Sequence, residues 1–394
     1  MGRPKGAPVS GRSLLSAAGR RRLGLVAALA LVIWAVGTAF APGVGWASYL
    51  TAMFYFLSLA LGGAVFLALH SVANAGWHVA IKRPAEAMAA YVPVGAVGML
   101  LVLVGVRDLY HWADPHAAHD PLLQAKHAFL NVPAFAARMA IVLAIWSLLV
   151  WRLRRNSVLQ DADGSLAHTR ANVALSAIFL LVFAWTFSLA SVDWLMSLEP
   201  HWFSTIFGFY NLSGVLLGGV ATLAVLVILL RNMDLLPEAA PGHLHDLGKL
   251  TFGFSTFWAY LWISQYLLVW YSNIPEETAY FVARAHGGWS LLFWLNLALN
   301  WIVPFFLLMP RAGKRHEVNL LWACGFTLAG RWLDVYLMVA PSAQPSHIGI
   351  GLTDVAATVG VGALFLLAVD RALGGAPLVA RRDPYLVESL HHHV

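Results

Sequence analysis

Long apolar runs dominate the chain, and short polar segments separate them. A membrane-spanning helix needs about 20 mostly apolar residues, and ten runs approach or exceed that length. Because the runs are continuous rather than alternating, they predict helices and not the strands of a membrane barrel. The predicted spans are 23–41, 48–70, 86–106, 131–151, 171–191, 206–230, 251–272, 287–309, 318–340 and 350–370.

The composition supports an integral membrane protein. Of the 394 residues, 60% are hydrophobic and 11% are charged, whereas soluble domains carry about 25% charged residues. The fold class we expect is therefore all-α and membrane-embedded. A basic tail (1–22), a ten-span membrane domain (23–370) and a second tail (371–394) make up the expected organisation.

The distribution of positive charge predicts the orientation. Of the 25 Lys and Arg residues, 20 fall in the tails and loops on one side of the predicted spans, and three fall on the other. The positive-inside rule then places both termini in the cytoplasm. Topology thus accounts for the basic composition, and nucleic-acid binding is not expected. Ala39-Phe40-Ala41 resembles a signal-peptide cleavage site, but we expect the first span to be retained, because cleavage would leave nine spans.

The segment 191–211 carries the most informative polar residues. Asp193, Glu199 and His201 lie among bulky apolar residues at the outer mouth of a predicted span, flanked by Trp194 and Trp202. Ionisable groups are costly at bilayer depth and usually mark a proton, ion or substrate path. The segment therefore predicts an outer-side proton site. The alternative is that Asp193 and Glu199 only cap helices or hold a partner subunit.

Two arginines lie within predicted spans and need partners. A buried guanidinium needs a carboxylate or a ring of carbonyls as its partner. For Arg138 this partner could be Asp193 or a carboxylate in a loop. Arg138 could equally serve only to hold two helices together. Arg331 and Asp334 are three residues apart, so they are expected to pair on one helix face. Asn296 and Asn300 repeat at helical spacing and predict a helix interface.

The predicted seventh span offers candidates for quinone contact. Gln265 and Tyr266 could hydrogen-bond a quinone carbonyl, although packing against a neighbouring helix is the plainer interpretation. Trp194 is a further contact candidate.

Resident metal or redox centres are not expected. The single cysteine, Cys324, cannot hold an iron–sulfur cluster or attach a c-type haem, and His70 has no deep histidine partner for haem b. The histidines and aspartates of the loop 107–131, which include His116, have no fixed metal-site spacing. The terminal histidines 391–393 are expected to be disordered.

Three blocks of sequence resemble one known family. They are SVDWLMSLEPHWFSTIFGFY (191–210), HDLGKLTFGFSTFWAYLWISQYLLVWYSNIPEE (245–277) and GRWLDVYLMVAP (330–341). They are similar to the NrfD-like membrane subunits of alternative complex III, and in particular to the quinone-binding subunit 2 type of the NrfD/polysulfide-reductase membrane-anchor superfamily. The similarity extends over about residues 45–370.

The resemblance implies two four-helix bundles plus flanking helices in a bacterial inner membrane. It implies quinol oxidation, with quinone or menaquinone as a possible ligand. The partners would be multihaem cytochrome c and iron–sulfur subunits and a sister NrfD-like subunit, which would hold the redox centres. The proton path expected on this basis comprises Asp193, Glu199, His201, Arg331, Asp334, Glu276, Glu277 and Arg138.

Two other functions remain open at the level of sequence. Ten spans with intramembrane charges would suit a secondary transporter, but we find no internal repeat and no matched helix breaks in the two halves. A purely structural anchor for peripheral redox subunits is the other alternative.

Overall fold

The computed structural model describes residues 13–114, 119–344 and 348–392, and within these residues the fold is entirely helical. The α-helices are α1 (Ala17–Phe40), α2 (Pro42–Val72), α3 (Lys82–Ala89), α4 (Val92–Leu100), α5 (Val106–Leu109), α6 (Pro121–Lys126), α7 (Val132–Asp163), α8 (Leu166–Trp194), α9 (Phe207–Asn232), α10 (Pro241–Ser272), α11 (Pro275–Ala285), α12 (Ser290–Leu297), α13 (Val303–Leu308), α14 (Arg311–Arg315), α15 (Glu317–Ala343), α16 (Leu352–Gly374) and α17 (Leu386–Leu390). Short 3₁₀ or π turns join several of them: η1 (Trp77–Ile81), η2 (Leu101–Gly105), η3 (His111–Ala113), η5 (Met196–Leu198), η6 (Gly287–Trp289) and η7 (Ala298–Ile302).

Eight helices or helical runs in the described chain are long and apolar enough to cross a membrane. They are Ala17–Phe40, Pro42–Val72, Trp77–Leu109, Val132–Asp163, Leu166–Leu198, Phe207–Asn232, Gly287–Leu308 and Leu352–Gly374. The other two predicted spans form α10, with 32 residues, and α15, with 27 residues. Both helices exceed the length that a span needs, but each carries charged and polar side chains.

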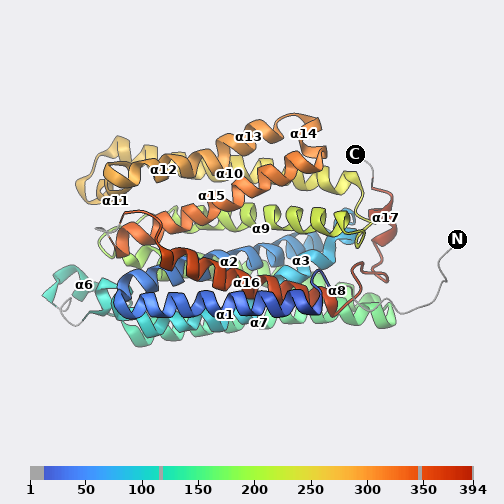
Figure 1. The fold of residues 1–394 in the computed structure, drawn as a ribbon, viewed down its shortest axis with the longest axis horizontal. Coiled ribbons are helices and arrows are strands. Elements are labelled where there is room, and N and C mark those ends of the chain that lie inside the picture. The colour runs from blue at the N-terminus through green and yellow to red at the C-terminus, as the bar shows by residue number, and fades with distance from the viewer. Residues whose placement is uncertain (1–12, 115–118, 345–347, 393–394) are drawn as a thin grey trace.

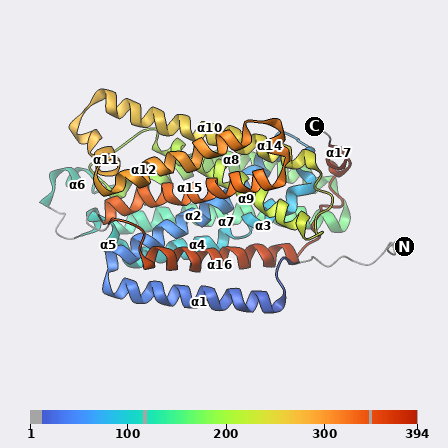
Figure 2. The same ribbon diagram turned by 45° about the horizontal axis from the view of Figure 1, so that its top comes forward.

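Helices α2 and α9 lie at the centre of the bundle, where they pack against each other. Helices α7 and α8 form an antiparallel pair beside α2 and α4. Helices α10 and α15 pack against α9, and α12 and α13 pack against α15. Helix α1 packs along α16 on the outside of the bundle (Figures 1 and 2). Both termini lie at one end of the bundle, and α6 and α11 lie at the other (Figure 1).

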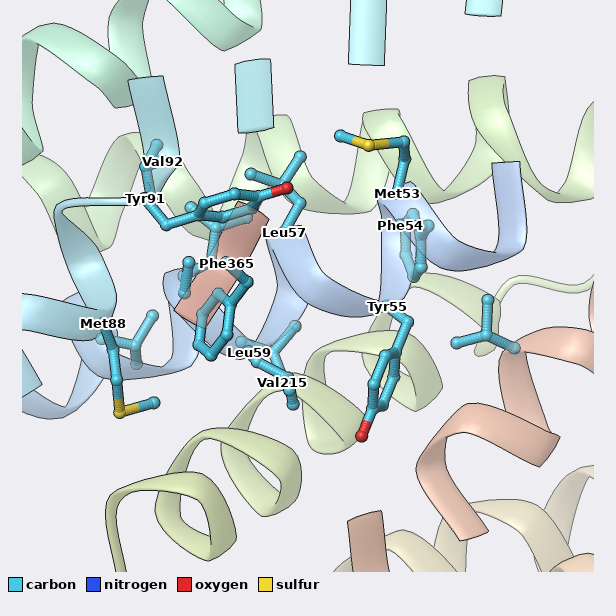
Figure 3. Packing of buried hydrophobic residues seen from close by; sticks show 14 of the residues in the cluster. Met53, Phe54, Tyr55, Leu57, Leu59, Met88, Tyr91, Val92, Val215 and Phe365 are labelled. Atoms are coloured by element: carbon cyan, nitrogen blue, oxygen red, sulfur yellow. The ribbon is translucent and has the colours of Figure 1, made fainter. Parts of the chain in front are cut away.

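The central contact between α2 and α9 depends on two glycines. A Cβ atom on Gly62 would lie 2.5 Å from the Cα of Gly219, so only glycine allows the two backbones to approach this closely. The surrounding core is large and apolar, with Phe54, Leu57 and Val215 among its buried side chains (Figure 3). This close packing holds the polar residues of α9 in fixed positions relative to α2.

Lys82 and Arg83, which lie between the predicted spans 48–70 and 86–106, are buried at the end of the bundle that holds both ends of the described chain. Arg83 forms ion pairs with Glu86 and Asp161, and its Nη2 donates to the Ser157 carbonyl at 3.1 Å. Arg83 is only 4% exposed. The segment between these predicted spans is therefore structured, as η1 followed by α3, because Arg83 pairs with Glu86 of α3 and with Asp161 of α7.

The C-terminal segment is ordered through His392, which corrects the expectation of a disordered tail. Residues 386–390 form α17, and Ser389 Oγ accepts a hydrogen bond from the Ala80 amide at 2.9 Å. His392 Nε2 lies 2.6 Å from an Asp246 oxygen, and Lys82 Nζ lies 2.8 Å from Asp383. These contacts tie the tail to η1 and to the start of α10. His393 lies outside the described residues.

Candidate functional site

A buried carboxylate, Asp334, lies at the centre of the candidate site. Its two oxygens accept hydrogen bonds from Arg331, from the Tyr210 hydroxyl, from Asn296 Nδ2 at 2.8 Å and from Trp258 Nε1 at 3.3 Å. A carboxylate offers about four acceptor positions, so this one is saturated by donors. Four donors from different helices therefore hold the Asp334 carboxylate in one position inside the bundle.

The donors to Asp334 come from four different helices. Arg331 lies one turn before it on α15, Tyr210 lies on α9, Trp258 on α10 and Asn296 on α12. Arg331 and Asp334 are each 2% exposed. Their pairing confirms the expectation from the i, i+3 spacing. Breaking a buried pair of this kind leaves an uncompensated charge, which costs about 3–5 kcal/mol.

Missing side chains and a distorted helix make room for this cluster. A Cβ atom on Gly214 would lie 2.1 Å from Arg331 Nη2, so any side chain there would displace the guanidinium. The π turn η7 contains Asn300, whose carbonyl would normally accept from residue 304. Pro304 has no amide hydrogen, and Ser255 Oγ donates to that carbonyl instead, at 2.6 Å. The Asn300 side chain in turn donates to Asn296 Oδ1 at 2.7 Å.

Asp193 forms a bidentate ion pair with Arg138. The Arg138 Nε donates to Asp193 Oδ2 at 2.7 Å, and its Nη2 donates to Oδ1 at 3.0 Å. The guanidinium also lies 3.9 Å from the centre of the Phe129 ring. The pair joins the start of α7 to the end of α8, and of the two partners considered from sequence the structure selects Asp193.

Glu199 has a separate partner, Arg284 of α11. Arg284 Nη2 lies 2.9 Å from Glu199 Oε1, and Ser342 Oγ donates to the same oxygen at 2.5 Å. The Arg284 Nε donates to the Leu337 carbonyl at 2.7 Å, one turn beyond Asp334 on α15. Arg284 is 2% exposed, whereas the Glu199 side chain is 27% exposed. The pair therefore lies between the Asp334 cluster and the surface.

Aromatic rings pack around Arg284. Its guanidinium lies 3.5 Å from the centre of the Tyr280 ring, and Tyr280 stacks on Trp202 at a centroid distance of 3.9 Å. Burial raises the pKa of Tyr280 to about 12, so the phenol stays protonated. The Trp202 indole donates to the Glu277 carbonyl at 3.1 Å. Trp202 is thus a buried packing residue that holds α11 in place.

The remaining predicted proton-path residues lie nearer the surface. His201 is exposed, and its Nε2 lies 2.9 Å from an Asp120 oxygen in the preceding loop. Glu276 is exposed in the first turn of α11, and Glu277 is half-buried beside it. Asp193, Glu199 and His201 therefore belong to three separate ion pairs, with partners on three different segments. His116 lies outside the described residues, and within the described ones no group of three metal-ligating side chains gathers.

A groove of about 450 Å³ opens beside this region, between the C-terminal half of α10 and α11. Its walls are mostly aromatic and aliphatic, with Tyr266, Phe281 and Trp270 among them, and Asn273 and His286 add polar groups to the lining. Trp270 is 63% exposed. The groove thus offers flat apolar surfaces together with a few hydrogen-bonding groups.

The three predicted quinone-contact residues lie in different environments. Tyr266 lines the groove. Gln265 is buried and donates to Ser204 Oγ at 2.9 Å. Trp194 is 1% exposed and packs against Phe54 and Trp146 in the core. Of the three, Tyr266 is the one that a ligand in the groove would touch.

Sequence reasoning missed several residues of the site. Tyr210 and Trp258 look like ordinary apolar residues of a span, and Arg284 looks like a loop charge. Tyr210 lies in the same quoted block as Asp193, but nothing in its spacing points to Asp334.

No protein-family model matches the chain, and a search of curated proteins finds no match either.

Proposed function

We propose that the chain is a membrane subunit of a quinol:electron-acceptor oxidoreductase of the alternative complex III type. In this proposal it contributes a quinol-binding groove and an outer-side proton path, and its partners carry the redox centres. The geometry that carries the proposal is the saturated Asp334 cluster, whose donor Trp258 lies on α10 about two helical turns before the groove residue Tyr266. The sequence blocks that resemble the NrfD-like subunits support the same function.

The proposed topology has ten spans, with α10 and α15 added to the eight apolar runs. Helices α2, α4, α7 and α8 make one four-helix bundle, and α9, α10, α12–α13 and α15 make the other. Helices α1 and α16 flank them. Both termini face the cytoplasm of a bacterium, which puts the groove and Glu199 at the outer face of the inner membrane. The excess of basic residues in the tails and in the loops on the same side supports this orientation.

Quinol binds in the groove between α10 and α11. Its ring lies against Tyr266 and Phe281, and its hydroxyl groups reach the polar groups of Asn273 and His286. An apolar pocket with a few convergent polar groups is the usual form of a small-molecule site. A membrane-soluble ligand can enter the groove from the side, because Trp270 is largely exposed on the outer surface of the bundle.

Protons leave the quinol site through hydroxyl and carboxylate groups. The Tyr210 hydroxyl donates to Asp334, so it can receive a proton at its oxygen while it passes its own proton to the carboxylate. Arg284 and Glu199 lie between Asp334 and the outer surface, and Glu199 is partly exposed. Glu199 is therefore the proposed exit group. Asp193, which is clamped by Arg138, fixes the α7–α8 end of the same surface.

Purification from native membranes in mild detergent tests this function. Co-purification of multihaem cytochrome c and iron–sulfur subunits, with quinol oxidation by the assembly, is the expected result. Isolation of the chain alone, with substrate uptake after reconstitution, would identify a transporter instead. In a third outcome, the redox subunits oxidise quinol equally well when this chain is removed from the assembly. That result would show that the chain is only a structural anchor.

A further inference from the structure

A basic groove lies on the opposite half of the molecule, at the end that holds both termini. It has a volume of about 300 Å³ and runs between α7, the start of α4 and the segment that follows α16. Its lining includes Trp151, Arg154, Arg155 and Leu159 of α7, with Pro93 and Gly375 facing them. This groove has no part in the site described above.

The two arginines of the groove make no direct ion pair with a carboxylate of the described residues, although Glu86 lies near Arg154. Arg154 is half-buried, and its Nη2 donates to the Ala372 carbonyl at 3.0 Å. Arg155 is exposed, and its guanidinium lies 5.1 Å from the centre of the Trp151 ring. Neither arginine forms an ion pair with another described residue. A partly buried guanidinium in this position favours an anionic ligand.

The depth of the groove matches a lipid headgroup. Arg154 lies 22 residues after Val132, the first residue of α7, so it stands about 33 Å along the helix at roughly 1.5 Å per residue. A bilayer core is about 30 Å thick, which places the guanidinium at its boundary. Trp151 occupies the interfacial depth that tryptophan favours.

Apolar side chains continue the groove toward the bilayer core. Val94 and Val97 of α4 are 48% and 72% exposed, and Leu148 of α7 is 54% exposed. They follow Pro93 and precede Trp151 along their helices, so acyl chains that descend from the arginines would lie against them. A free phosphate ion would use the arginines but gain nothing from this surface.

We propose that this groove binds the phosphodiester headgroup of an anionic phospholipid. Arg154 and Arg155 contact the phosphate oxygens, Trp151 covers one side of the headgroup, and the acyl chains lie along α4 and α7. Basic pockets between helices at a membrane boundary recognise anionic lipids through the same chemistry. The proposal depends on the chain spanning a membrane and is independent of the quinol-binding function.

Native mass spectrometry of the detergent-purified full chain tests the site. With phosphatidylglycerol and phosphatidylcholine as probes, we expect selective binding of phosphatidylglycerol. The double variant Arg154→Gln/Arg155→Gln should weaken that binding by about fivefold for each arginine removed. The charge-matched control Arg170→Gln/Arg311→Gln changes two exposed arginines outside the groove, and it should bind within about twofold of the unaltered protein.

One further variant and a competition measurement distinguish a lipid site from the alternatives. Arg155→Gln alone removes an exposed side chain, so it reports on binding even if the double variant fails to fold. Equal binding of the two lipids, or equal losses in the groove and control variants, would overturn the proposal. Displacement of phosphatidylglycerol by millimolar inorganic phosphate alone would show a phosphate site and would overturn the lipid assignment.

Discussion

Arg138 and Asp193 face each other across the α7–α8 pair as a bidentate ion pair, with N–O distances of 2.7 and 3.0 Å. Asp193 is almost fully buried, and the Arg138 side chain keeps 20% of its exposure. The pair joins the start of α7 to the end of α8. Asp193 is therefore held by a fixed partner, which makes it a structural residue as well as an ionisable one.

Replacing Asp193 with Asn should destabilise the protein, because it leaves the Arg138 guanidinium without its carboxylate. We expect the free energy of unfolding to fall by about 2–4 kcal/mol. This is less than the cost of breaking a fully buried ion pair, because Arg138 is partly exposed. Unfolding titrations in detergent measure the change. The exposed Asp108→Asn is the control and should change stability by less than about 0.5 kcal/mol. Equal midpoints for the two variants would contradict the clamp.

The position of Arg331 depends on the missing side chain of Gly214. Gly214→Ala places a carbon 2.1 Å from Arg331 Nη2, so the guanidinium must move away from Asp334. Overpacking of this kind costs about 1–3 kcal/mol. Gly253→Ala is the matched control, because a Cβ atom there meets nothing within 4 Å. It should leave stability unchanged or raise it by up to about 1 kcal/mol. Unchanged stability of the Gly214→Ala variant, together with unchanged quinol oxidation by the assembled complex, would show that the position of Arg331 is not critical.

The docking of the C-terminal helix α17 should depend on pH through His243. His243 Nδ1 accepts from the Ala240 amide, and its Nε2 lies 3.1 Å from Ser389 Oγ, an arrangement that suits a neutral ring. Burial, followed by the nearby His392, lowers the pKa of His243 below 6.5, while Asp246 raises it. Because the docked state disfavours the proton, docking is complete above pH 6.5 and is lost as the pH falls further.

A spin label at Leu390→Cys measures this change, and the buried Cys324 does not compete for the label. Mobility of the label should increase as the pH falls from 7.5 toward 5. His392 and Asp246 form a neighbouring pair that protonation of His392 would strengthen. Tighter docking at low pH would mean that this pair outweighs His243, and it would contradict the prediction.

The sequence predicted the elements of this site better than it predicted their contacts. Long apolar runs and an i, i+3 spacing were enough to expect the helices and the Arg331–Asp334 pair. Tyr210, Trp258 and Asn296 converge on Asp334 only because α9, α10 and α12 pack around α15, and no local pattern encodes that packing.

Asp193 and Glu199 also show that sequence spacing does not predict which side chains pair. Asp193 and Glu199 are six residues apart and read as one cluster, yet α8 ends between them. Asp193 pairs with α7, whereas Glu199 pairs with Arg284 of α11 and with Ser342 of α15. Partners so distant along the chain can be identified only from the folded arrangement.

The most direct test of the proposed function is quinol oxidation by the purified complex with Asp334→Asn. The exposed Asp234→Asn serves as the matched control, and only preparations with the full set of subunits are compared. Loss of the carboxylate removes the proposed proton acceptor, so the rate and the coupled proton release should fall by at least about 100-fold, with the control unchanged. Wild-type rates and proton release in a fully assembled Asp334→Asn complex would contradict a proton path through this residue.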